Sequence, residues 1–132
     1  MDNQRQDFAK HIHVGKSGES CAIQFLKRQG YRILETNYRT PWGEIDVIAK
    51  ERDILCFIEV KTRQSAAKGS PLEAVSTLKQ RKLARMALGY LQKNKLNHQR
   101  MRFDVVGVCQ NFPANEQVTL VRNAFRADNT YF

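Results

Sequence analysis

Three charged residues lie within or directly after two apolar stretches of the sequence, and their types and spacing suit phosphate chemistry. Residues 45–49 are apolar except for Asp46, and residues 54–60 are apolar except for Glu59. Both stretches have the length and composition of β-strands, and a short polar connection between them predicts a hairpin. Lys61 follows Glu59 by two positions, so both side chains leave the same face of the second strand. The open end of this hairpin is expected to gather two carboxylates and one ammonium group.

Carboxylates placed together in apolar strands are costly, because they repel each other and lose hydration. A divalent cation removes that repulsion, and Mg²⁺ prefers oxygen ligands together with water or phosphate oxygens. Asp46 and Glu59 are therefore candidate metal ligands, with the backbone carbonyl of Val60 as a further oxygen. Lys61 would orient or deprotonate the attacking water, or neutralise charge on the phosphate, while the metal polarises it. The pattern predicts metal-dependent phosphodiester hydrolysis; the alternative is a structural ion pair between Lys61 and an acid.

A fourth acid, Glu19, lies in a segment with helical periodicity over residues 16–29. Ala22, Ile23 and Leu26 form the apolar stripe of this helix, and they lie within about 60° of Glu19 on a helical wheel. An acid in the first turn is also favoured by the helix dipole without any further role. We favour the interpretation that Glu19 points inward and reaches the carboxylates of the hairpin.

The charge balance points to a polyanionic partner. The 132 residues include 22 Lys+Arg and 13 Asp+Glu, giving a net charge of +9. Nucleic acid is preferred to a membrane surface, because no basic amphipathic segment carries an aromatic lipid-facing side. The alternative is a basic protein whose charge serves solubility.

One long interval, between Glu73 and Asp104, contains no acid at all. Its eight basic residues are Lys79, Arg81, Lys82, Arg85, Lys93, Lys95, Arg100 and Arg102. A solvated helix face usually mixes signs, so this run is typical of a phosphate-binding surface. The candidate nucleic-acid contacts are Lys79, Gln80, Arg81, Lys82 and Arg85, together with Arg63.

Strands and helices must position these residues. The two hairpin strands are expected to be joined by the four polar residues 50–53. The other predicted elements are an extended segment over 31–39, a helical turn from Pro71, a helix over 76–94, and strands over 102–109 and 117–125. A strand–helix–strand unit favours a crossover, so the strand over 102–109 should be parallel to the second hairpin strand. The last strand is expected at a sheet edge, and Lys79 and Gln80 are expected on the sheet side of the helix. Trp42 is expected to pack in the core, and the alternative is that it contacts a substrate. Asp104 is expected to have a structural role.

Length and composition, 42% hydrophobic and 27% charged, predict one globular domain over residues 15–125. Residues 1–14 are interpreted as a flexible lead-in and 126–132 as a tail. Residues 64–70 form a small polar loop that could close over a substrate. No apolar run approaches the roughly 20 residues of a membrane span. The three cysteines are scattered in apolar segments, which indicates reduced core residues and a cytoplasmic location.

Short motifs spread over nearly the whole expected domain resemble those of known proteins. They are G-x-x-G-E at 15–19, N-Y-R at 37–39, G-E-I-D-V-I-A at 43–49, F-I-E-V-K-T-R at 57–63, K-Q at 79–80, R-F-D-V-V at 102–106 and N-A-F at 123–125. Together these motifs resemble the YraN family of small bacterial proteins. More broadly, the order of elements and acids resembles the PD-(D/E)xK nuclease superfamily, which includes restriction endonucleases and archaeal Holliday-junction resolvases. Ile45 stands where the proline that names the superfamily would precede the first acid.

This resemblance implies an α/β fold with a restriction endonuclease-like αβββαβ core and a central mixed sheet flanked by helices. It implies that Asp46 and Glu59 bind Mg²⁺ or Mn²⁺, that Lys61 serves catalysis and that Glu19 assists. The expected function is metal-dependent cleavage of DNA, which is favoured over RNA as the substrate and could be branched. Cleavage of two strands would need two active sites, which a homodimer could supply. The alternative is a nucleic-acid-binding or assembly factor that keeps the fold without turnover.

Overall fold

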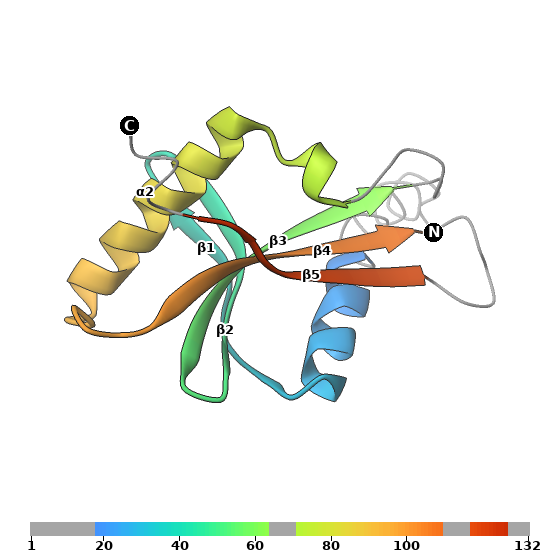
Figure 1. Cartoon of the computed structure of the whole chain (residues 1–132), viewed down its shortest axis with the longest axis horizontal. Helices are drawn as coiled ribbons and strands as arrows, with labels where there is room; N and C mark the ends of the chain where they lie inside the picture. The colour runs from blue at the N-terminus through green and yellow to red at the C-terminus, as the bar shows by residue number, and fades with distance from the viewer. Residues whose placement is uncertain (1–17, 64–70, 110–116, 127–132) are drawn as a thin grey trace, which may run out of the picture.

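The structure is a computed structural model that describes residues 18–63, 71–109 and 117–126. The expected lead-in (1–14), the loop over 64–70 and, apart from Arg126, the tail lie outside the described residues. The described elements are a first helix over 18–28, β1 (Tyr31–Thr40), β2 (Gly43–Glu51), β3 (Ile54–Arg63), the 3-10 helix η1 (Pro71–Ala74), α2 (Thr77–Lys93), β4 (Met101–Cys109) and β5 (Gln117–Phe125). The predicted α/β fold with an αβββαβ core is confirmed (Figure 1).

The five strands form one mixed sheet in the order β1-β2-β3-β4-β5. β3 and β4 are parallel, whereas the other three neighbouring pairs are antiparallel. The parallel pair follows from α2, which carries the chain back to the starting end of the sheet before β4 begins. The predicted crossover is therefore confirmed, as is the position of β5 at an edge.

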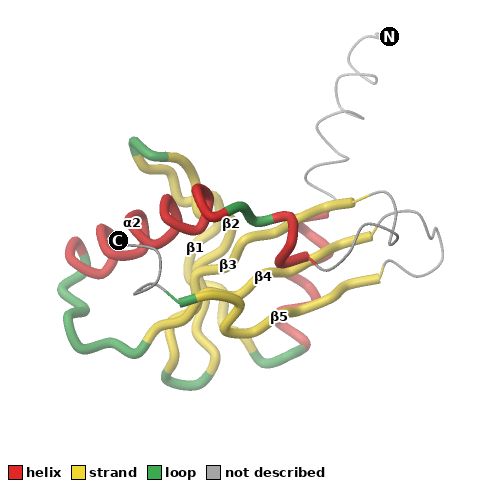
Figure 2. The backbone as a smooth tube through the Cα atoms, turned by 45° about the horizontal axis from the view of Figure 1, so that its top comes forward, coloured by secondary structure: helices red, strands yellow, loops and turns green. Residues whose placement is uncertain are grey.

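The first helix and α2 cover opposite faces of the sheet, as Figure 2 shows. α2 packs its buried residues, among them Leu83 and Met86, against Phe57 and Phe103. On the other face, Ala22 and Leu26 of the first helix pack with Ile58 and Val106, among others. Alternate residues of β3 thus contribute to different cores, as the period of two in a strand requires. The sheet is covered on both sides, which explains its nearly continuous apolar central strands.

The hairpin turn between β2 and β3 is shorter than the sequence predicted. Lys50 and Glu51 belong to β2 and pair with residues of β3, which leaves Arg52 and Asp53 as the turn. Arg52 has a positive φ of 56°. This left-handed conformation lets the chain reverse within two residues, so the expected four-residue connection is wrong.

Trp42 also departs from the prediction, because it lies in the turn between β1 and β2 and is 49% exposed. β1 is an edge strand, so the tip of its hairpin has no further strand beyond it to bury the ring. The core under α2 is filled instead by side chains such as Met86 and Tyr90. The expected burial of Trp42 in the core is therefore wrong.

Candidate functional site

Asp46 lies where β2 and β3 stop pairing. The last residue pair of their ladder at this end is Val47 with Ile58, whereas β2 remains paired with β1 as far as Gly43. The Asp46 carboxylate replaces the missing ladder partner, since its Oδ2 accepts a hydrogen bond of 2.7 Å from the backbone N–H of Val60. Divergence of the two strands thus opens the end of the hairpin and holds Asp46 against the backbone beside Glu59.

Glu59 is a buried carboxylate with an unsatisfied oxygen. The residue is 4% exposed, and its Oε1 lies 3.6 Å from the Nζ of both Lys61 and Lys79. Its Oε2 is buried and has no hydrogen-bond partner among the described residues. A buried, unpaired carboxylate oxygen costs free energy, and such atoms are uncommon in native proteins. This oxygen therefore fits a cation or another ligand bound at the site.

The two lysines reach Glu59 from different elements. Lys61 stands two residues further along β3, on the same face. Lys79 lies in the first turn of α2, where its backbone N–H donates to the Oγ of the N-cap residue Ser76 at 3.1 Å. The prediction that Lys79 faces the carboxylates is confirmed. Gln80, also partly buried, donates from its Nε2 to the backbone carbonyl of Val75 at 3.1 Å.

Asp46 also lies close to two further acids, Glu19 and Glu44. Carboxylate oxygens of Glu19, Glu44 and Asp46 all lie within 4.8 Å of one another, a grouping that could hold a metal ion. Asn37 joins two of them, since its Nδ2 donates to Glu19 Oε1 at 3.0 Å and to Glu44 Oε1 at 2.7 Å. Arg39 adds a positive charge, with its Nε 3.7 Å from Glu44 Oε2. The expectation that Glu19 reaches the carboxylates of the hairpin is thus confirmed for Asp46, and its own side chain is partly exposed.

The surroundings of Asp46 raise the pKa of its carboxyl group towards neutral pH. Burial and then repulsion from Glu59 raise the pKa of Asp46 to about 7, and Glu19 contributes in the same direction. The hydrogen bond from Val60 and the positive charge of Lys79 partly oppose this rise in the pKa of Asp46. A bound cation would favour the ionised carboxylate and displace the proton.

Glu44 and Asn37 were not among the site residues predicted from the sequence, although both lie in motifs that resemble those of the YraN family. Glu44 precedes Asp46 by two residues in a strand, which is a detectable sign that both face the same side. Asn37 has a positive φ of 52°, a conformation that asparagine tolerates better than most residues. Its contact with two acids depends on how β1 pairs with β2, and no sequence pattern reveals that register.

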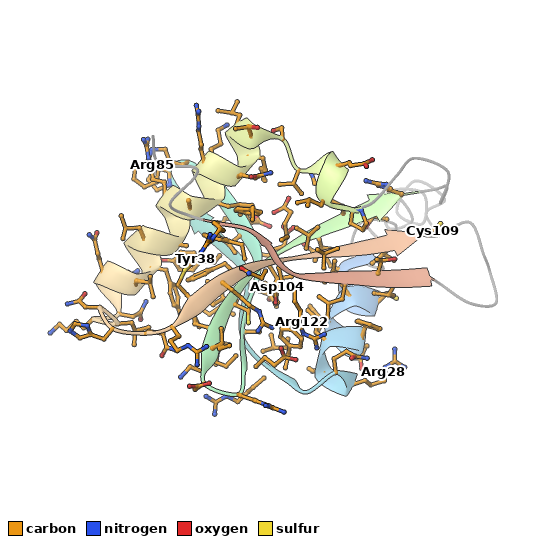
Figure 3. All side chains as sticks on the ribbon, viewed as in Figure 1. Arg28, Tyr38, Arg85, Asp104, Cys109 and Arg122 are labelled. Carbon is orange, nitrogen blue, oxygen red and sulfur yellow. The ribbon has the colours of Figure 1, made fainter. Side chains whose placement is uncertain are left out.

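The remaining candidate nucleic-acid contacts are distributed along two elements. Arg81, Lys82 and Arg85 are exposed on α2, and Figure 3 labels Arg85 on this helix. Arg63 is the last residue of β3 and stands two positions beyond Lys61.

Arg102 does not join the expected phosphate-binding run. Its guanidinium hydrogen-bonds to Glu51, to Tyr31 and to Asp104, and its side chain is largely buried. Arg122 holds the other oxygen of Glu51 at 2.7 Å. These arginines lower the pKa of Glu51 to about 2. The network joins β1, β2, β4 and β5, in agreement with the structural role expected for Asp104.

Within the described part of the chain, no helix is both long and apolar enough to cross a membrane.

Comparison with known proteins identifies the family. The family described as "Uncharacterised protein family UPF0102" matches residues 18–108. A UPF0102 protein of Desulfosudis oleivorans is 46% identical over 128 residues, covering 97% of each chain. A UPF0102 protein of Acetivibrio thermocellus is 46% identical over 117 residues, covering 85% of this chain and 90% of the relative. The chain therefore belongs to the UPF0102 family, as its resemblance to YraN-like proteins predicted.

Proposed function

We propose that this protein is a Mg²⁺- or Mn²⁺-dependent nuclease that hydrolyses phosphodiester bonds of DNA by the chemistry of the PD-(D/E)xK superfamily. The observation that carries the proposal is Glu59, a buried acid with one unpartnered oxygen beside a second acid of raised pKa. Charges are expensive to bury without a function or a partner. Burying Glu59 beside Asp46 costs free energy, and a cation bound between the two carboxylates would offset that cost.

The metal ligands in this proposal are Asp46, Glu59 and the backbone carbonyl of Val60. Glu59 is preferred to Glu44, because the Glu44 carboxylate already accepts a hydrogen bond from Asn37, whereas Glu59 Oε2 has no such partner among the described residues. A bound Mg²⁺ or Mn²⁺ would polarise the scissile phosphate and lower the pKa of a water molecule.

Lys61 and Glu19 complete the proposed catalytic set. Lys61 is partly exposed beside Glu59, so it can orient the attacking water or neutralise the charge that develops on the phosphate. Lys79, on the same carboxylate oxygen, supplies a second positive charge at the point where a phosphate would enter. Glu19 assists through its position beside Asp46.

Exposed basic residues of α2 favour a nucleic acid as the substrate. Arg81, Lys82 and Arg85 continue the positive charge of Lys79 along the helix, and no acid lies in α2. Phosphate contacts of this kind make binding weaker as salt increases. Cleavage of both strands at a branch would use two copies of the site, so a homodimer accompanies that form of the proposal. A cytoplasmic location, where DNA is available, belongs to the same proposal.

The test is cleavage of labelled branched, duplex and single-stranded DNA by the purified protein, with Mg²⁺, with Mn²⁺ or with EDTA. Cleavage should require the metal and should be lost in Asp46→Asn. Asp53→Asn is the matched control, because it makes the same chemical change at the exposed hairpin turn, where activity should be unaffected. Absence of metal-dependent cleavage of all three substrates, or cleavage that survives Asp46→Asn, would refute the proposal.

The exposed positive face of α2 also supports a second candidate, a nucleic-acid-binding or assembly factor without catalytic activity. This candidate predicts salt-sensitive DNA binding that EDTA leaves unchanged. It also predicts that Lys61→Ala does not impair the cellular role of the protein. Metal-dependent cleavage that disappears in Lys61→Ala would exclude it.

A further inference from the structure

We propose that Trp42 is a stacking platform for an unpaired base of single-stranded DNA, placed a few nucleotides from the acidic site. The choice of DNA rests on the function proposed above, whereas the platform itself rests on a separate part of the molecule. Trp42 belongs to the turn between β1 and β2, not to the group of acids and lysines.

The turn presents the indole ring to solvent on a fixed backbone. The backbone N–H of Trp42 donates to Thr40 Oγ1 at 3.1 Å, and that hydroxyl donates to the carbonyl of Gly43 at 3.0 Å. Gly43 has a φ of 140°, which side-chain-bearing residues rarely adopt. The turn therefore fixes the backbone of Trp42 while 49% of the residue stays exposed.

Arg85 relates this ring to the basic surface of α2. Its guanidinium carbon lies 5.8 Å from the centre of the Trp42 ring, within the range of a cation–π interaction. Figure 3 labels Arg85 on the outer side of α2. The ring is thereby held beside a positive charge while about half of the residue stays exposed. An aromatic face next to a cation suits a base and its phosphate, because each part of a nucleotide has a matching partner.

The charges around Trp42 select nucleic acid over an apolar protein partner. Arg81 and Lys82, which precede Arg85 by about one helical turn, are also exposed on α2, and the helix carries no acid. The exposed leucines of α2, Leu78 and Leu88, lack a π-face and cannot stack on a base in the same way. Sites for single-stranded nucleic acid combine aromatic rings with positive charge, and Trp42 beside Arg85 offers both.

The position of the platform fits a strand that continues to the acids. Trp42 precedes Asp46 by four residues, and the intervening residues belong to β2. At about 3.3 Å per residue, the two backbone positions are at most about 13 Å apart. This separation is short enough for one short segment of single-stranded DNA to reach both the ring and the acids. Stacking requires a base that is free of its neighbours, which favours single-stranded segments over intact duplex.

Trp42 is the single tryptophan of the sequence, so its fluorescence reports on this site directly. The wild-type protein in EDTA would be titrated with a single-stranded oligonucleotide and with a blunt duplex of the same length. We expect saturable quenching by the single strand and much weaker quenching by the duplex. Fluorescence anisotropy of labelled oligonucleotides would then measure affinity in variants whose folding is checked by circular dichroism.

Trp42→Ala should weaken binding of the single strand by about tenfold, the effect typical of losing one stacked base. Trp42→Phe should retain most of the affinity, and Leu88→Ala, a change at another exposed apolar residue, should leave it unchanged. Binding without quenching, or equal affinity of Trp42→Ala and wild type, would overturn the platform even if metal-dependent cleavage persists. Quenching together with the loss in Trp42→Ala would support the platform even if no cleavage is found.

Discussion

Replacing Asp46 by asparagine should make the metal-free protein more stable at alkaline pH, although the same change should abolish its response to metal. Burial and Glu59 raise the pKa of Asp46 to about 7 from an ordinary value of 3.8. The folded state therefore holds a proton that the unfolded state has released, so the free energy of unfolding falls as pH rises from about 4 to 7. Asparagine removes this charge and keeps an oxygen that can accept the hydrogen bond from Val60.

The size of the effect follows from the pKa difference. A rise of about three pH units corresponds to a ceiling of about 4 kcal/mol, at about 1.4 kcal/mol for each unit. Asp46 is partly exposed and is attracted by Lys79, and solvent screening reduces the net value. We therefore expect Asp46→Asn to raise the free energy of unfolding by about 1–2 kcal/mol at pH 8 and by close to zero at pH 4.

Urea unfolding in EDTA at pH 4 and pH 8 measures this difference. Addition of Mn²⁺ at pH 8 should then stabilise the wild type by about 3 kcal/mol at a hundredfold excess over its dissociation constant. The variant should gain little, so the order of stability of the two proteins should reverse. Asp53→Asn is the control for the charge change; its side chain is 75% exposed, and its stability should match the wild type at both pH values.

Two results would refute this reasoning. One is a variant that is less stable than the wild type at pH 8 in EDTA, because the Asp46 charge would then be stabilising in the metal-free protein. The other is equal stabilisation of both proteins by Mn²⁺, because the metal would then bind without this carboxylate.

Three further predictions concern other charged residues and two glycines. Glu59→Gln should weaken Mn²⁺ binding, measured by calorimetry, by about tenfold or more, and by more than Glu44→Gln does. A larger effect of Glu44→Gln would place the ion between Glu19, Glu44 and Asp46 instead. Glu51→Gln should lower the free energy of unfolding by about 2 kcal/mol at pH 7. The lowered pKa of Glu51 contributes stability that is present above the ordinary value of 4.5 and is lost as pH falls to about 2. Urea unfolding across this pH range measures the loss, and a loss that is independent of pH would contradict the prediction. Gly107→Ala should destabilise by about 1–3 kcal/mol, since a β-carbon there would lie 2.3 Å from a proline side chain of η1, whereas Gly89→Ala in α2 meets no atom within 4 Å and should stabilise by about 1 kcal/mol; thermal unfolding that shows the same sign for both would contradict this.

Local pattern was sufficient for most of the architecture. The strand predicted over 117–125 is β5, and the helix predicted over 76–94 is α2 with its two cap residues. The parallel pairing of β3 with β4 follows from the helix between them, because the handedness and length of a crossover leave few alternatives. The length of the turn between β2 and β3 could not be predicted from the sequence. Its first residue, Arg52, adopts a left-handed conformation, which glycine or asparagine would have indicated but arginine does not.

The sequence alone determined that Asp46, Glu59 and Lys61 meet at one end of a hairpin, because strand alternation and chain reversal are local properties. Tertiary structure decided the surroundings that give this group its chemistry. The divergence of β2 from β3, the approach of Lys79 from α2 and the contact of Asn37 with two acids depend on packing and register between distant segments. Burial itself is such a property, and through the pKa of Asp46 and the unpartnered oxygen of Glu59 it makes the site a candidate for metal.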